Sequence, residues 1–289
     1  MTVAPTLGCE ERDLLAGYIY QLCGIQLDRS KHYLIESRLR SLAAQTSSGT
    51  YSELYNKARS DRGGPLEHAI IDAVTTGETL FFRDRAPFDL LRQKLLPDLI
   101  DRRSRSAAGK IPIRIWSAAS STGQEIYSIA IILRELLGAA QKYDIRLLGT
   151  DISSQAVARA SLGIYRDIEI ERGLAEDVRS RHFIKKEAGW QVRDEVRALA
   201  SFRILNLLRD FSALGRFDII FCRNVAIYFS ESDKASLFDR LGRALAPDGA
   251  LIVGATESLD SATGFEPKRH MRSVYYQRAA PTKSIPPDR

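Results

Sequence analysis

The chain has 289 residues, of which 44% are hydrophobic and 27% charged, which is ordinary for a soluble globular protein with one large domain or a large and a small one. No apolar run approaches the ~20 residues of a membrane span, and the N-terminus lacks the pattern of a secretory signal. Cys9, Cys23 and Cys222 lack metal-ligand spacing and fit reduced thiols. We therefore expect a cytosolic protein with no membrane insertion and no metal.

The formal net charge of +6 is unevenly distributed along the chain. Residues 1–83 carry nine Lys and Arg against ten Asp and Glu, whereas residues 85–110 carry seven against three. Residues 268–289 carry six Lys and Arg against one Asp. Such runs are usually solvated faces, but they can also attract an acidic protein surface.

The N-terminal quarter of the chain shows helical periodicity and no convincing strand, which predicts a small all-helical domain. Apolar spacing predicts a first helix that stops at Gly24 and a second that Asp28 or Ser30 can cap. Two more helices are predicted over residues 50–60 and 66–74. The last ten residues, APTKSIPPDR, look frayed.

Residues 111–137, IPIRIWSAASSTGQEIYSIAIILRELL, predict a strand, a tight loop and a helix, a unit that aims backbone N–H groups at a ligand. The loop has only Gly123 and no G-x-G-x-x-G or G-K-[ST], which disfavours a phosphate site. Glu125 at the helix start would repel phosphate but can meet the ammonium group of an amino-acid-like cofactor such as S-adenosylmethionine. The alternative is that Glu125 only complements the helix dipole.

A second acid ends the next predicted strand, IRLLGTD at residues 145–151. Ligands of α/β sheets bind beyond the carboxyl ends of the strands, so Asp151 can accept hydrogen bonds from both hydroxyls of a ribose. Asp151 also precedes a predicted helix and can serve as its N-cap. The two interpretations are compatible.

The rest of the chain predicts further strands. Residues 158–183 resemble two helices around a turn, and short strands at FIKKE, AGW, QVRDEV and ALASFRIL predict an antiparallel subdomain inserted at about residues 166–204. Residues 217–224, FDIIFCRN, predict a buried strand, followed by a helix over 233–245, a turn at PDG and strands at ALIVG and SVYYQR. About seven strands alternating mostly with helices are the α/β pattern of class I S-adenosylmethionine-dependent methyltransferases, with a Rossmann-like sheet.

Five ordered segments carry a more specific resemblance: TTGETLFFRD, RIWSAASSTGQEIYSIA, GTDISSQAVARASLGIYR, FDIIFCRNVAIYF and LIVGATES. In this order and spacing the chain resembles a CheR-type chemotaxis receptor methyltransferase from about Cys9 to about Arg278. The family transfers a methyl group from S-adenosylmethionine to receptor glutamates and releases S-adenosylhomocysteine. The resemblance implies a helical substrate-docking domain over 1–76 and a catalytic domain over 77–289.

The resemblance also implies roles for individual residues. Arg83 would orient the substrate carboxylate, Tyr228 would hydrogen bond near the transfer site, and Arg38 and Arg40 would face the substrate, although Arg40 can simply pair with Glu36. The expected cofactor contacts are Gly77, Thr79, Arg83, Glu125, Asp151, Asn206, Leu207, Arg223 and Asn224. Asn206 and Leu207 would bind the adenine.

Two departures from the family pattern keep alternatives open. Gly77 stands where the family usually has Asn, and Gln124 where it often has Glu, so a cofactor-binding signalling scaffold with little turnover is one alternative. A methyltransferase acting on nucleic acid or a small molecule would share the sheet. Methylation of base amino groups typically uses an N-P-P-Y-like motif, whereas the matching strand here ends CRNVAIYF, so we expect no nucleic-acid partner.

The expected partners are the cytoplasmic methylation helices of transmembrane chemoreceptors. We expect the protein to be a monomer that is recruited to receptor arrays at the membrane. Some family members also capture the receptor's C-terminal peptide on a long, glycine-rich ribbon loop. The corresponding loop here, between Phe183 and Val192, is short and has a single Gly189. We therefore expect docking that is independent of this peptide and uses the N-terminal domain and the basic segment 85–110.

Overall fold

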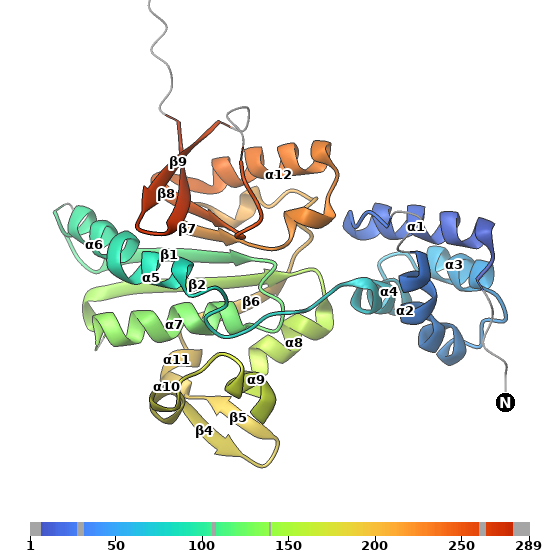
Figure 1. Cartoon of the computed structure of the whole chain (residues 1–289), viewed down its shortest axis with the longest axis horizontal. Helices are drawn as coiled ribbons and strands as arrows, with labels where there is room; N and C mark the ends of the chain where they lie inside the picture. Colours follow the sequence, from blue (N-terminus) through green and yellow to red (C-terminus); the bar gives the residue numbers. More distant parts are fainter. Residues whose placement is uncertain (1–6, 28–31, 106–107, 139, 260–263, 280–289) are drawn as a thin grey trace, which may run out of the picture.

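The computed structural model describes residues 7–27, 32–105, 108–138, 140–259 and 264–279. Four N-terminal helices form a group beside a larger body in which helices flank a twisted sheet (Figure 1). No helix of these residues is both long and apolar enough to cross a membrane.

The N-terminal group has its own apolar core, centred on buried Leu15, Ile35 and Leu54. Gly24 ends the first helix in the left-handed conformation, at φ 73°, and the Thr50 side chain accepts a hydrogen bond from Glu53 N to cap the third. The predicted helices are confirmed with these bounds: α1 Cys9–Cys23, α2 His32–Gln45, α3 Tyr51–Ser60 and α4 Pro65–Val74. The expected caps Asp28 and Ser30, like the tail 280–289, lie outside the described residues.

The main sheet has seven strands in the order β6-β2-β1-β7-β8-β10-β9. The first five are parallel to one another, and β10 runs antiparallel to both of its neighbours, β8 and β9, which confirms the expected fold class. The strands are β1 Ile111–Ala118, β2 Tyr143–Asp151, β6 Ala200–Ile204, β7 Phe217–Cys222, β8 Leu245–Val253, β9 Phe265–His270 and β10 Ser273–Arg278. The helices of this body are α5 Ala86–Leu90, η2 Leu91–Leu95, α6 Leu96–Ser104, α7 Gln124–Leu137, η3 Ala140–Lys142, α8 Ser154–Leu162, η4 Ser212–Leu214, η5 Ala226–Tyr228 and α12 Glu231–Ala244.

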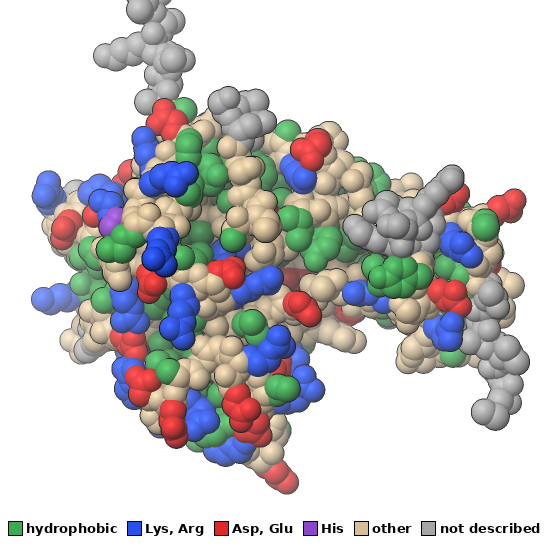
Figure 2. Space-filling model, in the orientation of Figure 1, with side chains coloured by type: hydrophobic (Ala, Val, Ile, Leu, Met, Phe, Trp, Pro, Cys, Tyr) green, Lys and Arg blue, Asp and Glu red, His purple; other side chains and the backbone are tan. Residues whose placement is uncertain are grey.

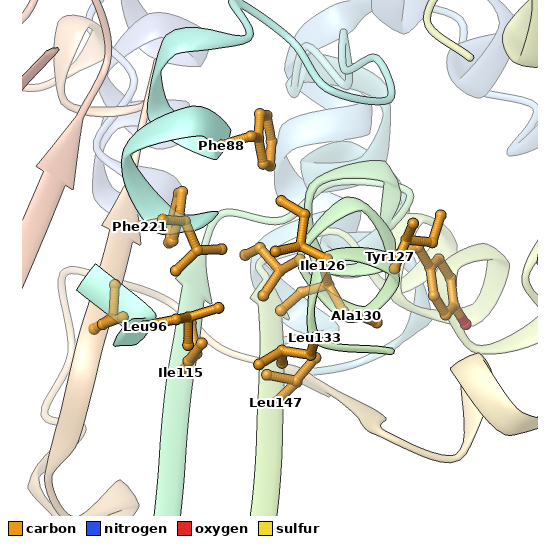
Figure 3. Close-up of a cluster of buried hydrophobic side chains, with 14 of the residues drawn as sticks. Phe88, Leu96, Ile115, Ile126, Tyr127, Ala130, Leu133, Leu147 and Phe221 are labelled. Atoms are coloured by element: carbon orange, nitrogen blue, oxygen red, sulfur yellow. The ribbon is translucent and has the colours of Figure 1, made fainter. Parts of the chain in front are cut away.

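Helix α7 is held on the sheet by the apolar stripe that its sequence predicts. Ile126, Ala130 and Leu133 lie against Ile115 of β1 and Leu147 of β2, all at most 1% exposed (Figure 3). Burying each of the larger side chains stabilises the fold by about 1.5–3 kcal/mol. The start of α7 is thereby fixed beside the ends of β1 and β2.

A second, three-stranded antiparallel sheet has the order β3-β5-β4, with β3 Ile164–Tyr165, β4 Phe183–Lys186 and β5 Gly189–Val192. Helices α9 Asp167–Glu171, α10 Glu176–His182 and α11 Asp194–Arg197 accompany it (Figure 1). The expected antiparallel subdomain is therefore present.

Two of the strands expected in this subdomain were misplaced. QVRDEV is a strand only to Val192, because Asp194 begins helix α11, in which Val196 is fully buried. ALASFRIL contributes β6, which pairs in parallel with β2 of the main sheet. The turn expected at PDG is not observed, because strand β8 continues through these residues. A register shift in the pairing of β8 with β7 accommodates them.

The N-terminal helices contact the main body on two sides. On one side the Tyr20 hydroxyl donates to Asp233 Oδ2 at 2.7 Å. On the other side, at the start of α8, the Ser154 hydroxyl donates to Asp72 Oδ2 at 2.8 Å. The segment 75–80 joins α4 to the body without helix or strand, and the domain boundary at residue 76 stays a prediction.

The turn between α9 and α10 packs directly on the segment that follows α4. A methyl group at Gly173 would lie 2.3 Å from the Phe81 carbonyl oxygen, so Gly173→Ala must displace one of the two backbones. We expect the free energy of unfolding to fall by about 1–3 kcal/mol, measured by denaturant titration. Gly109→Ala is the control, because its methyl group meets open space. Equal stability of both variants would show that this close approach is not required.

Candidate functional site

A cavity of about 260 Å³ lies between the N-terminal helices and the carboxyl ends of β1, β2, β6 and β7. Its lining comes from both parts of the chain and includes most of the residues singled out in the sequence. The predicted residues that line it are Arg38, Thr79, Arg83, Glu125, Asp151, Asn206, Leu207, Arg223, Asn224 and Tyr228. Gly77 and Arg40 do not line it.

The loop after β1 forms the floor of this cavity and is built from left-handed backbone. Ala119 has φ 62°, Ser121 φ 50° and Gly123 φ 94°. Only glycine fits at position 123, because a side-chain carbon there would lie 2.9 Å from Ala160 Cβ. The loop thus needs its single glycine for close contact with α8.

Asp151 fixes this loop to the end of β2. Its Oδ2 accepts from Ser121 N at 2.8 Å and its Oδ1 from Ser153 N at 2.9 Å. Burial raises the pKa of Asp151, against the opposing effect of these backbone N–H groups. The N-cap of α8 is Ser153, whose hydroxyl accepts from Ala156 N, and not Asp151. Each Asp151 oxygen keeps a lone pair for a hydroxyl of a ligand.

Glu125 stands in the first turn of α7 with its carboxylate turned toward the ends of β1 and β7. The Ser117 hydroxyl donates to its Oε1 at 2.7 Å, and Arg223 Nη1 donates to its Oε2 at 2.8 Å. Glu125 is therefore more than a partner of the helix dipole. Ser117, fully buried on β1, was not singled out in the sequence, because a serine at a strand end carries no signal of its own.

The segment 77–85 brings Arg83 to the cavity. The Ser121 hydroxyl donates to the Gly77 carbonyl oxygen at 2.9 Å, and Phe82 N donates to Ser128 Oγ at 2.9 Å. Arg83 Nη1 reaches back to the Glu78 carbonyl oxygen at 3.0 Å. Gly77 thus takes part through its backbone, and Arg83 lines the cavity with a half-buried side chain.

Arg223 follows β7 and is the most buried charged side chain of the cavity. Besides Glu125, its guanidinium reaches Asp84 Oδ2 at 2.7 Å and the Arg83 carbonyl oxygen at 3.1 Å. Asp84 was missed as a site residue, although it ends the quoted segment TTGETLFFRD. A lone acid in a turn gives no hint that its partner lies 139 residues further along the chain.

Asn206 and Tyr228 both connect the cavity to the N-terminal helices. The Asn206 amide donates to the Leu22 carbonyl oxygen at 2.8 Å, and its Oδ1 accepts from Leu208 N at 2.9 Å. The Tyr228 carbonyl oxygen accepts from Gln26 N at 3.0 Å. The Tyr228 hydroxyl makes no hydrogen bond with any described residue, so it is available to a ligand.

Asn224 is held in a sharp backbone turn at φ 57°. Its backbone N–H donates to Glu257 Oε2 at 2.7 Å, and Gly254 N donates to the same oxygen at 2.7 Å. The other Glu257 oxygen is buried without a hydrogen-bond partner among the described residues. Glu257, in the segment LIVGATES, does not line the cavity but holds the backbone of Asn224, which does, and the sequence did not single it out.

Arg38 and Arg40 lie differently from one another on α2. Arg38 Nη1 donates to the carbonyl oxygens of Val74 at 3.0 Å and Thr75 at 2.9 Å, so it caps the end of α4. Arg40 is exposed and pairs with Glu36 at 2.8 Å, the alternative given by the sequence. Neither contact excludes a role in docking, which stays a prediction.

Comparison with known proteins identifies the family of the chain. Residues 10–75 match the model of the CheR methyltransferase all-alpha domain, and residues 77–275 match that of the CheR methyltransferase SAM binding domain. The chain is 39% identical to chemotaxis protein methyltransferase 1 of Pseudomonas aeruginosa over 254 residues, 86% of this chain and 90% of that protein. It is also 39% identical to chemotaxis protein methyltransferase 1 of Vibrio cholerae over 280 residues, 95% of this chain and 98% of that protein. The chain therefore belongs to the CheR methyltransferase family and is a methyltransferase whose cofactor is S-adenosylmethionine.

Proposed function

We propose that this protein methylates glutamate side chains on the cytoplasmic helices of transmembrane chemoreceptors, giving glutamyl methyl esters in chemotactic adaptation. The observation that carries the proposal is one cavity that joins acids suited to the cofactor, Glu125 and Asp151, to a guanidinium suited to a carboxylate substrate, Arg83. The family membership and the relatives' names support the same reaction. No observation favours the scaffold alternative, since Gly77 still contributes its backbone.

The residues of the cavity fit S-adenosylmethionine. Asp151 has free lone pairs for the ribose hydroxyls, and Glu125 lies where the ammonium group of the amino-acid end can reach it. Leu207 lines the same cavity as an apolar surface for the adenine, beside Asn206. Thr79 lines it from segment 77–85. We assign Arg223 and Asn224, like Glu125, to the amino-acid end of the cofactor.

The reaction needs positioning more than acid or base chemistry. The bound cofactor supplies an electrophilic methyl group on a sulfonium sulfur. A glutamate with an ordinary pKa near ~4.3 is already ionised at neutral pH, so no general base is required. Arg83 orients the substrate carboxylate, and Tyr228 offers near the transfer point a hydroxyl that bonds to none of the described residues. Correct placement of two reactants can itself contribute several kcal/mol to the lowering of the barrier, about 7–11 at most.

We infer that the protein acts as a cytoplasmic monomer at receptor arrays and docks through its N-terminal helices. The basic segment 85–110 contributes less than its composition suggests, since Arg92 pairs with Glu135 and Arg102 with Asp248. Its helix α6 also lies at the end of the molecule away from α1–α4 (Figure 1). Figure 2 shows acidic and basic side chains interspersed on this face. Arg85 is exposed and lies two residues after Arg83, so among the basic residues of this segment it is the best placed to contact a docked receptor.

Replacement of Asp151 tests the cofactor site. Asp151→Ala should weaken binding of S-adenosylhomocysteine by about 1–3 kcal/mol, because the ribose hydroxyls lose their acceptor in a buried site. Titration calorimetry measures the affinity. Asp144→Ala, at the opposite end of the same strand, is the matched control and should bind normally. Unchanged affinity of Asp151→Ala would remove Asp151 from the cofactor site.

Replacement of Arg83 tests the substrate site. Arg83→Ala should lose most of its turnover while its affinity for S-adenosylhomocysteine changes little, because an interaction made mainly in the transition state appears in the rate. Arg83→Lys should also fail, since lysine keeps the charge but lacks the planar fork that fixes a carboxylate. The rate is measured with radiolabelled S-adenosylmethionine and receptor membranes, followed by alkaline release of methanol. A parallel loss of cofactor binding would instead place Arg83 in the cofactor site.

The β4–β5 connection predicts independence from a receptor tail. Only Glu187 and Ala188 separate the two strands, so the edge lacks a long loop that could close over an added strand. A full-length receptor and one without its C-terminal tail should therefore be methylated at similar rates. Both rates should fall as salt rises, since exposed charges are screened over ~8–10 Å at physiological ionic strength. A large drop on removing the tail, or binding of the isolated tail peptide, would contradict this prediction.

A further inference from the structure

The guanidinium of Arg223 connects two parts of the site that are far apart in the sequence. Its side chain is 2% exposed. Nη1 donates to Glu125 Oε2 at 2.8 Å, whereas Nη2 donates to Asp84 Oδ2 at 2.7 Å and to the Arg83 carbonyl oxygen at 3.1 Å. One rigid, planar group thus contacts the proposed cofactor acid and the main chain of the proposed substrate arginine.

The second carboxylate determines the charge of this cluster. A buried guanidinium beside Glu125 alone would neutralise the acid on which a cationic ligand group depends. Asp84 supplies a further carboxylate on the other side of Arg223, at 45% side-chain exposure. The three groups together therefore keep a negative charge, and that charge favours an ammonium group at Glu125.

The backbone around Arg83 also depends on this contact. Phe82, Asp84 and Arg85 all have positive φ, at 51°, 65° and 27°, which costs free energy for residues other than glycine. Asp is among the side chains that tolerate the left-handed region best. The bonds from Arg223 to Asp84 and to the Arg83 carbonyl oxygen hold this turn from the side of the sheet.

We infer that Asp84 is a positioning residue for methyl transfer. Through Arg223 it fixes the main chain of Arg83, and it leaves Glu125 with the charge to attract the amino end of the cofactor. The inference rests on the proposed function and extends it to a residue outside the cofactor and substrate contacts.

Asp84→Asn is the decisive variant, because asparagine has the same shape, tolerates φ 65° and lacks only the charge. We expect S-adenosylhomocysteine to bind about 3–10-fold more weakly in titration calorimetry, because Glu125 then carries the only negative charge that Arg223 contacts among the described residues. At saturating cofactor, kcat for receptor methylation should fall about 10-fold or more, with a smaller change in KM for the receptor. The midpoint of thermal unfolding should stay within about 2 °C of that of the wild type.

Asp89→Asn provides the matched control on the following helix, α5. Asp89 is exposed, and its side chain makes no hydrogen bond or ion pair with any described residue. This variant should retain wild-type affinity and turnover. It shows what the loss of one exposed carboxylate near Asp84 in the sequence does by itself.

Wild-type affinity and wild-type kcat in Asp84→Asn would overturn the inference. So would a large drop in the unfolding midpoint with equal losses in kcat and affinity, because that pattern belongs to a purely structural residue. Should Asp84→Asn not fold, Arg223→Lys decides, since lysine keeps the charge but cannot span both carboxylates. Normal kcat in Arg223→Lys would then overturn the inference. If the wild type methylates no receptor, the proposed function fails, whereas the calorimetric comparison still decides whether Asp84 supports cofactor binding.

Discussion

The parallel pairing of β1 with β2 and with β7 is the constraint on which the site depends. Ala118 pairs with Thr150 on one side and with Cys222 on the other, so the three strands end together. Asp151 at the end of β2 and Arg223 after β7 therefore lie at the same edge of the sheet, on either side of the end of β1. The strand ends thus bring the polar residues of this part of the site together.

Most of the main sheet, helix α7 and the acids at the strand ends could be predicted from the sequence, for a physical reason. Buried parallel strands require apolar runs, and β7 Phe217–Cys222 is buried at every position, so such runs are visible without an alignment. Helix α7 is visible for a similar reason, because its apolar stripe repeats over more than three turns. Strand-end acids such as Asp151 then follow from the positions of the strands.

The remaining strands and site residues could not be predicted, because their positions depend on partners that lie far away in the sequence. Strand β3 has only two residues, Ile164 and Tyr165, and exists because β5 pairs with it. The edge strand β6 alternates like an antiparallel strand, and only its pairing with β2 places it in the main sheet. Asp84 and Ser117 became recognisable as site residues only when Arg223 and Glu125 were found beside them. A single charged or hydroxyl side chain gives no sign of a partner that the fold brings to it.

The hydrogen bond from Asn206 to the Leu22 carbonyl oxygen has a thermodynamic consequence. The helices proposed to meet the receptor also cover the cofactor cavity, so both ligands act on the position of one group of helices. Binding free energies linked in this way are reciprocal: any change that a docked receptor makes in cofactor affinity must be matched by an equal change that the cofactor makes in receptor affinity. The affinity for the demethylated product and the affinity for the receptor are then two readouts of a single coupling free energy.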